Sequence, residues 1–261
     1  MPELAADGPL SADGPLSAGD FSSWLAKVLA AIRGEGATDV ACGSCVACCS
    51  SAQFVHIAPD EQDVLAHVPE ALLFPAPGLP RGHVLMGYDE HGRCPMLRTD
   101  GCSIYEHRPR TCRTYDCRVF PAAGVLPDEP GKAPIATQAA RWEFTYASSS
   151  DSAEHAAVRA AAAFLRSRHD ALGTDLAPAT TTQLAVAALE VHRIFVHQHE
   201  PSVHDVRVEL SSRRSNRSPS LSLPHSPHSP HPPQPSNTHP PPALLVPLHH
   251  RDPRANPAAS P

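Results

Sequence analysis

Apolar side chains recur at helical spacing in four parts of the chain, and this pattern predicts most of the folded structure. The predicted helices cover residues 24–32, 59–68, 153–169 and 181–197. Three residues before the first of them are of types that cap helix N-termini: Asp20, Ser22 and Ser23. We therefore expect helices on both sides of a central region in which the helical pattern is weak.

Segments with other patterns predict strands and a loop. Residues 142–146 alternate aromatic rings with polar side chains, which favours a half-buried core strand over a binding platform. Residues 83–88 and 93–97 predict a hairpin that turns at 89–92, and the proline-rich residues 74–80 predict a loop. The expected fold class is α+β, a small cysteine-rich, metal-organised domain with flanking helices and a disordered C-terminal tail.

The two ends of the chain differ in composition from the centre. Residues 1–19 contain the sequence ADGPLS twice and predict a flexible N-terminal repeat, because Asp-Gly-Pro propagates neither helix nor central strand. Residues 201–261 are rich in Ser, Pro and His and predict a disordered tail. Histidines three positions apart in this tail either bind metal weakly or reflect composition alone: His225, His228 and His231. Residues 20–200 are the expected metal-binding domain, with a motif core at 40–120.

Charge and hydropathy narrow the classes of partner. The formal net charge is −6, which gives no electrostatic footprint for nucleic acid or for an anionic membrane. No segment approaches the roughly 20 apolar residues of a membrane-spanning helix, and no secretory signal is recognised. We therefore expect a cytoplasmic protein without nucleic-acid or membrane partners, in a compartment where thiols stay reduced.

The eight cysteines carry the candidate chemistry. They follow the pattern C-x2-C-x2-C-C and then, after a gap, C-x7-C-x9-C-x4-C: Cys42, Cys45, Cys48, Cys49, Cys94, Cys102, Cys112 and Cys117. Two-residue gaps let neighbouring sulfurs converge on one metal, and Gly43 suits a tight loop that needs positive φ. Metal binding by the whole set is favoured over a disulfide framework, which belongs to secreted chains. Adjacent side chains diverge, so Cys48 and Cys49 are expected to serve different metals, or one of them stays a redox thiol.

Polar residues around the cysteines are candidates for supporting roles. Five arginines suit a negatively charged thiolate cluster: Arg98, Arg108, Arg110, Arg113 and Arg118. Three histidines flank the ligands and are alternative donors, with His91 the favoured one: His56, His83 and His91. If the chain is an enzyme, the expected participants are Tyr105, Glu106, Arg108, Tyr115 and Asp116, although support of the ligands is the favoured role for each.

The cysteine pattern and its neighbours resemble the YkgJ-like cysteine-cluster family, whose members are zinc- or iron-chelating domains. The resemblance rests on CxxCxxCC at residues 42–49, C-P-x-L at 94–97 and G-C-x-I-Y-x-x-R-P-x-x-C-R-x-x-x-C over 101–117. It implies a metal-binding protein that holds zinc or iron through the eight cysteines. A related branch is associated with lysine N-methylation of flagellin, so the resemblance also implies an alternative, an S-adenosylmethionine-dependent protein lysine methyltransferase.

The identity of the metal stays open between two arrangements. Zinc would use all eight thiolates in two closed four-sulfur sites, which makes a structural domain. An iron–sulfur cluster would use four ligands, for example Cys42, Cys45 and Cys48 with one cysteine of the second group. The sequence shows no glycine-rich loop of the kind that cradles a nucleotide-like cofactor, which favours the binding function over the enzyme. The protein partner or substrate is unknown.

Overall fold

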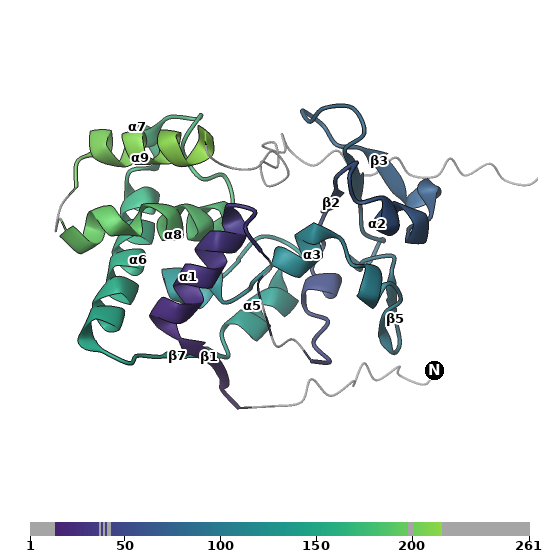
Figure 1. Cartoon of the computed structure of the whole chain (residues 1–261), viewed down its shortest axis with the longest axis horizontal. Coiled ribbons are helices and arrows are strands. Elements are labelled where there is room, and N and C mark those ends of the chain that lie inside the picture. The colour runs from purple at the N-terminus through teal and green to yellow at the C-terminus, as the bar shows by residue number, and fades with distance from the viewer. Residues whose placement is uncertain (1–13, 37, 39, 41–42, 198–200, 216–261) are drawn as a thin grey trace, which may run out of the picture. The chain divides into compact units, whose positions relative to one another are not determined.

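The computed structural model describes residues 14–36, 38, 40, 43–197 and 201–215, and they form the mixed α+β fold expected from the sequence (Figure 1). The helices are α1 (Phe21–Ile32), α2 (Gln62–His67), α3 (Arg110–Thr114), α4 (Val119–Ala123), α5 (Ala133–Ala139), α6 (Ser149–Ser167), α7 (His169–Leu172), α8 (Thr181–His197) and α9 (Val203–Ser215). Short 3₁₀ helices are η1 (Cys48–Ser50), η2 (Glu70–Leu72) and η3 (Tyr105–His107). The strands are β1 (Leu16–Asp20), β2 (Val55–Ile57), β3 (Leu73–Pro75), β4 (Val84–Met86), β5 (Leu97–Arg98), β6 (Gly101–Cys102) and β7 (Trp142–Thr145).

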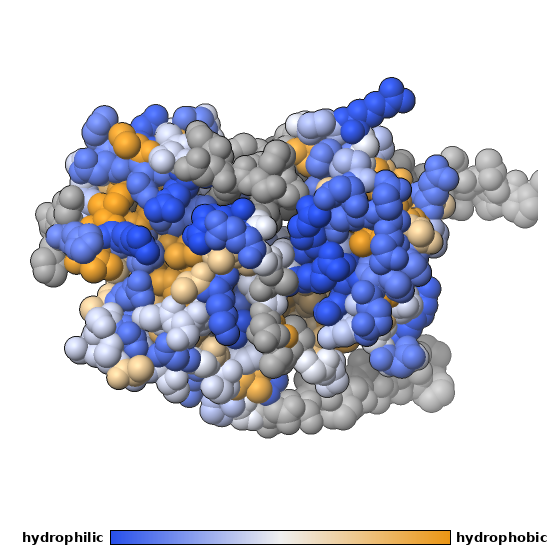
Figure 2. All heavy atoms as spheres, in the orientation of Figure 1, coloured by the Kyte–Doolittle hydropathy of each residue, from blue (hydrophilic) through white to orange (hydrophobic). Residues whose placement is uncertain are grey.

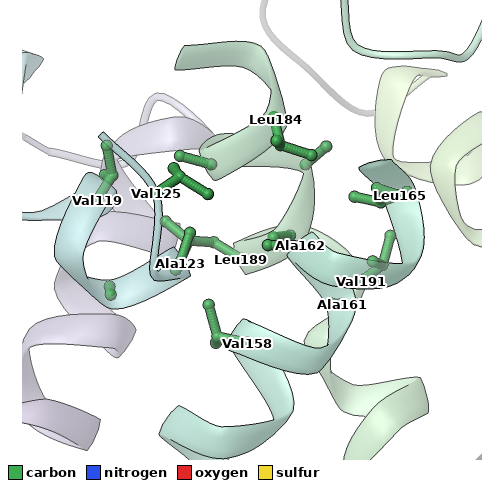
Figure 3. Packing of buried hydrophobic residues seen from close by; sticks show 14 of the residues in the cluster. Val119, Ala123, Val125, Val158, Ala161, Ala162, Leu165, Leu184, Leu189 and Val191 are labelled. Carbon is green, nitrogen blue, oxygen red and sulfur yellow. The ribbon is translucent and has the colours of Figure 1, made fainter. Parts of the chain in front are cut away.

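The larger apolar core lies among α1, α4, α6 and α8. Many of its members are Ala and Val, which let α6 and α8 approach closely. Figure 3 shows Val158, Ala162 and Leu165 of α6 facing Leu184 and Leu189 of α8. Close packing of these small side chains accompanies a few buried aromatic rings of the same core, among them Phe21, Trp24 and Phe120.

Local sequence signals set the helix boundaries. The Asp20 carboxylate accepts a hydrogen bond from the backbone N–H of Ser23 at 2.9 Å, so Asp20 caps α1 as predicted. α8 covers the predicted residues 181–197. α6 begins earlier than predicted, because Ser148 and Asp151 form a capping box. α2 is shorter than the predicted helix at 59–68, because residues 59–61 form a turn before it.

Two segments, one near each end of the described chain, have secondary structure that was not predicted. Residues 16–19, expected in a flexible lead-in, belong to β1, which pairs in parallel with β7. Residues 203–215, expected in a disordered tail, form α9, whose Val206 and Leu210 are buried in the larger core. Ser202 and Asp205 exchange hydrogen bonds at the start of α9 and supply its cap. Residues 1–13 of the predicted repeat and 216–261 of the predicted tail, with His225, His228 and His231, lie outside the described residues.

Strand pairing in the central region differs from the predicted hairpin. The turn at 89–92 forms, with the Asp89 N–H donating to the Arg93 carbonyl at 2.8 Å. However, β4 pairs with β2 on one side and β3 on the other, whereas β5 pairs with β6. The hairpin prediction was therefore wrong, because both edges of β4 are taken by segments that precede it. The loop prediction for 74–80 was wrong at Phe74 and Pro75, where Pro75 ends the edge strand β3.

A second, smaller apolar core lies beside this sheet. Its buried members come from β2, α2, β4 and the segment around β5, β6 and η3: Val55, Ile57, Val64, Val68, Met86, Met96 and Ile104. Cys94, Cys102 and Cys112 pack against it. Within the described part of the chain, no helix is both long and apolar enough to traverse a membrane.

We expect Leu189→Ala to lower the free energy of unfolding by about 2–5 kcal/mol, because the side chain is fully buried between α8 and α6 and its loss leaves a cavity. Urea unfolding followed by circular dichroism measures this. The matched control, Leu126→Ala, removes a side chain that is 46% exposed and should change the value by less than about 0.5 kcal/mol. Equal losses in the two variants would contradict the assigned core.

Candidate metal centre

The CxxCxxCC segment forms a short loop followed by η1. Cys45 lies in the loop, and Cys48 and Cys49 lie in η1. Gly43 has φ of +52°, which confirms the expected left-handed turn. Cys42 lies outside the described residues. The Ser51 hydroxyl donates to the Ala47 carbonyl at 2.6 Å and holds the end of η1.

Backbone hydrogen bonds bring the second cysteine group to the first. The Cys94 N–H donates to the Cys49 carbonyl at 2.7 Å, and the Ala52 N–H donates to the Gly92 carbonyl at the same distance. Cys102 follows in β6, and Cys112 lies in α3. Thr111, beside it, donates to the His56 carbonyl at 2.8 Å, which ties α3 to β2. Segments some forty residues apart in the sequence are therefore held together.

The described cysteines of the two groups influence each other's ionisation. A hydrogen bond from the Cys49 thiol lowers the pKa of Cys48 to about 7, with a smaller contribution from the positive charge of Arg108. Donating that hydrogen bond raises the pKa of Cys49. Burial, followed by the sulfurs of Cys48, Cys94 and Cys102, raises the pKa of Cys112 to about 12. Burial followed by the sulfurs of Cys102 and Cys48 raises the pKa of Cys94. Five thiols thus occupy one electrostatic environment.

Cys117 has different surroundings. The Trp142 indole N–H donates to its sulfur at 3.2 Å, and the side chain packs against the larger core. Burial raises the pKa of Tyr115, and the sulfurs of Cys117 and Cys48 add to the effect. Tyr115 therefore lies within electrostatic range of both cysteines and connects Cys117 to the group around Cys48.

Asp116 is a structural residue in this arrangement. Its carboxylate is 4% exposed and accepts hydrogen bonds from the Trp24 indole N–H at 2.8 Å and from the Arg118 guanidinium at 2.8 Å. These bonds join α1 to the segment between Cys112 and Cys117. Asp116 therefore supports the ligand segment, as expected from the sequence. The positive charge of Arg118, which was expected beside the thiolates, pairs with the Asp116 carboxylate.

Two other arginines, Arg108 and Arg110, have different partners. Arg108 lowers the pKa of both Cys48 and Cys112, and its guanidinium lies 3.6 Å from the centre of the Tyr105 ring. Arg110 pairs with Asp60 at 2.7 Å. The expectation of positive charge beside the thiolates is met by Arg108, whereas Arg110 stabilises the contact between α3 and the turn before α2.

The candidate histidines do not join the cysteines. His56 is buried, and its Nε2 lies 2.9 Å from Nδ1 of His83 in a stacked pair. His91 is exposed and lies 3.4 Å from Glu90. A different set, missed from the sequence, brings three ligand atoms within 4.8 Å of one another, one each from Asp63, His67 and His107. The i, i+4 spacing of Asp63 and His67 was a usable signal, but the sequence gave none for His107.

The donor set fits a soft or borderline metal ion. None of the seven described cysteines forms a disulfide. Thiolates suit zinc and iron, and their mutual repulsion favours a cation among them. Among the described residues, no three cysteine sulfurs all lie within 4.8 Å of one another. Four sulfurs around one zinc ion lie about 3.8 Å apart, so a single-ion site would require these segments to contract.

Lys132 anchors the residues that follow η1. Its ammonium donates to the carbonyls of Ser51 and Ala52 at 2.9 and 3.0 Å and to Oε1 of Gln53 at 2.8 Å. Burial lowers the pKa of Lys132, which shows how far this contact is removed from solvent. Lys132 therefore fixes the direction in which the chain leaves the CxxCxxCC segment.

We expect Lys132→Met to weaken metal binding by about tenfold or more, because outer-shell contacts of this kind orient the ligands. Competition with a chromophoric chelator measures the affinity. Lys27→Met, at an exposed position of α1, is the matched control and should leave it unchanged. An unchanged affinity in Lys132→Met would show that the anchor is irrelevant to the centre.

Comparison with known proteins identifies one family that the cysteine-bearing segment resembles. No curated protein and no solved structure matched the chain. Residues 41–127 match a family model described as "CxxCxxCC: Putative zinc- or iron-chelating domain". The matched residues include all eight cysteines, from Cys42 to Cys117. The resemblance seen in the sequence is thereby confirmed: the cysteine-bearing segment, residues 41–127, is similar to this zinc- or iron-chelating family.

Proposed function

We propose that the chain binds zinc or iron through the thiolates of its eight cysteines. The observation that carries the proposal is the backbone hydrogen bond from the Cys94 N–H to the Cys49 carbonyl, because it holds one residue of each cysteine group together. The shared electrostatic environment of the thiols supports it further. Cys42 and Cys117 are included on the sequence pattern, and the proximity of Cys117 and Cys48 to Tyr115 supports the inclusion of Cys117.

The residues around the cysteines prepare them to bind a cation. The pKa of Cys48 is lowered to about 7, because Cys49 donates a hydrogen bond to it and Arg108 lies nearby. The thiols of Cys94 and Cys112 keep their protons at neutral pH, because they are buried and close to other sulfurs. A bound metal would supply the positive charge that lets these sulfurs ionise. We propose a cytoplasmic setting, in which the thiols stay reduced and available to a metal.

The methyltransferase alternative rests on the family resemblance and stays a prediction. Titration of the metal-loaded chain with S-adenosylmethionine tests whether it binds this co-substrate. The candidate participants Tyr105 and Asp116 already have structural partners, Arg108 and Trp24 respectively.

Metal analysis of the full chain, purified without oxygen, tests the proposed function. We expect tightly held zinc or iron, and loss of most of it in Cys48→Ser and Cys112→Ser, because both remove a donor from the shared site. His91→Ala is the control and should keep the metal, since His91 is exposed and paired with Glu90. Iron with equal sulfide and a visible absorption band would identify a cluster, and colourless protein with zinc would identify a structural zinc site. A chain that holds neither metal would contradict the proposal.

Removing the metal should loosen the cysteine region and spare the helices. The smaller core has few buried side chains, and three cysteines complete it, so metal-binding energy there is folding energy. Hydrogen exchange measured by mass spectrometry should show loss of protection in residues 43–112 after chelation, with α6 and α8 still protected. Uniform protection before and after chelation would show that the metal does not organise this region.

A further inference from the structure

A group of potential metal ligands lies outside the cysteine set, on α2 and η3. Asp63 and His67 are one turn apart on α2, and His107 ends η3. One ligand atom from each lies within 4.8 Å of the other two, and the group contains no cysteine. The proposed function does not use any of these three residues.

The distances within the group match those of a metal's coordination shell. A carboxylate oxygen of Asp63 lies 2.7 Å from Nδ1 of His107, and the other lies 3.7 Å from Nδ1 of His67. Ligand atoms bonded to zinc at 2.0–2.1 Å in a tetrahedron lie about 3.3 Å apart. The two observed separations lie on either side of this value, and binding of an ion would require the side chains to turn from their present hydrogen bonds.

The two imidazoles are held in place before any metal arrives. Their rings stack with centroids 3.6 Å apart and planes inclined by 8°. Nδ1 of His67 also lies 2.7 Å from the backbone carbonyl oxygen of Asp63, within its own helix. Glu61, just before α2, accepts a hydrogen bond from the Arg110 N–H at 2.6 Å and holds α2 near the segment that follows η3. Pre-orientation of this kind lowers the entropic cost of binding.

The group is open to solvent and carries negative charge. The Asp63 and His67 side chains are 68% and 40% exposed, and Figure 2 shows mainly hydrophilic side chains over α2 on this face. The pKa of Asp63 is lowered, first by its hydrogen bond with His107, so the carboxylate is ionised at neutral pH. The positive charge of Arg113 also acts on Asp63, but its guanidinium lies 3.9 Å from the Glu61 carboxylate, which offsets it.

We propose that Asp63, His67 and His107 form a second metal site, separate from the cysteines, that binds a divalent transition-metal ion such as Zn²⁺. Two imidazoles and one carboxylate are a donor set that zinc accepts, and water would complete the shell because the group is exposed. A metal bound at Nδ1 of His107 would take the place of that nitrogen's hydrogen bond to Asp63, and the imidazole must be neutral to bind it.

Zinc titration of the full chain tests the proposal. The protein is first loaded with zinc and then dialysed against a weak chelator, which leaves ions bound by thiolates and removes those bound by nitrogen and oxygen. The readout is the further Zn²⁺ taken up in calorimetry. We expect about one further equivalent in the wild type, weakened at least about tenfold in the double variant His67→Gln, His107→Gln and in Asp63→Asn.

The control is the double variant His91→Gln, His169→Gln. It also removes two exposed histidines, each 3.4 Å from the carboxylate of a neighbouring acidic residue, and it should bind like the wild type. Equal uptake in all variants would assign the binding to other histidines and overturn the proposal, as would no further uptake by the wild type. Every variant keeps all eight cysteines, so failure of the cysteine site would lower the initial zinc content in all of them alike. If the histidine double variant misfolds, Asp63→Asn decides the question.

Discussion

The repulsion between thiolates gathered in a small volume is the constraint on which the cysteine region depends. Cys94 and Cys112 are buried beside other sulfurs, and their pKa values are raised as a result. Cys48 differs from these two, because a hydrogen bond from the Cys49 thiol and the charge of Arg108 lower its pKa and stabilise the thiolate. Without a cation, Cys94 and Cys112 stay protonated and pack as small apolar groups against the smaller core.

The helical core supplies the rigid support that the cysteine region lacks. Trp24 of α1 donates to Asp116, and Trp142 of β7 donates to Cys117, so the last part of the motif is attached to the larger core. Lys132, just before α5, holds the carbonyls of Ser51 and Ala52 after η1. The beginning and the end of the cysteine motif are therefore positioned by elements outside it, which explains why flanking helices accompany so short a motif.

Features set by local sequence were predictable, and features set by distant partners were not. The periodicity around α1 and α8 located both helices, because packing follows the spacing of apolar residues. The parallel pairing of β1 with β7 joins residues more than a hundred positions apart, and nothing in the pattern of residues 16–20 indicates it. The same distinction applies to the sites. Close spacing identified the cysteines, whereas His107 reaches Asp63 only through the packing of η3 on α2.

The two donor sets differ in chemistry, and the consecutive residues His107 and Arg108 connect them. His107 faces the carboxylate of Asp63, while Arg108 acts on the sulfurs of Cys48 and Cys112. Thiolates hold zinc and iron strongly and exclude harder ions, whereas imidazole and carboxylate in an exposed group bind more weakly and exchange with solvent. A metal at Asp63 would be the labile one and a metal at the cysteines the retained one. Movement of η3 on loading either site would reposition the other, since residues 107 and 108 share a backbone.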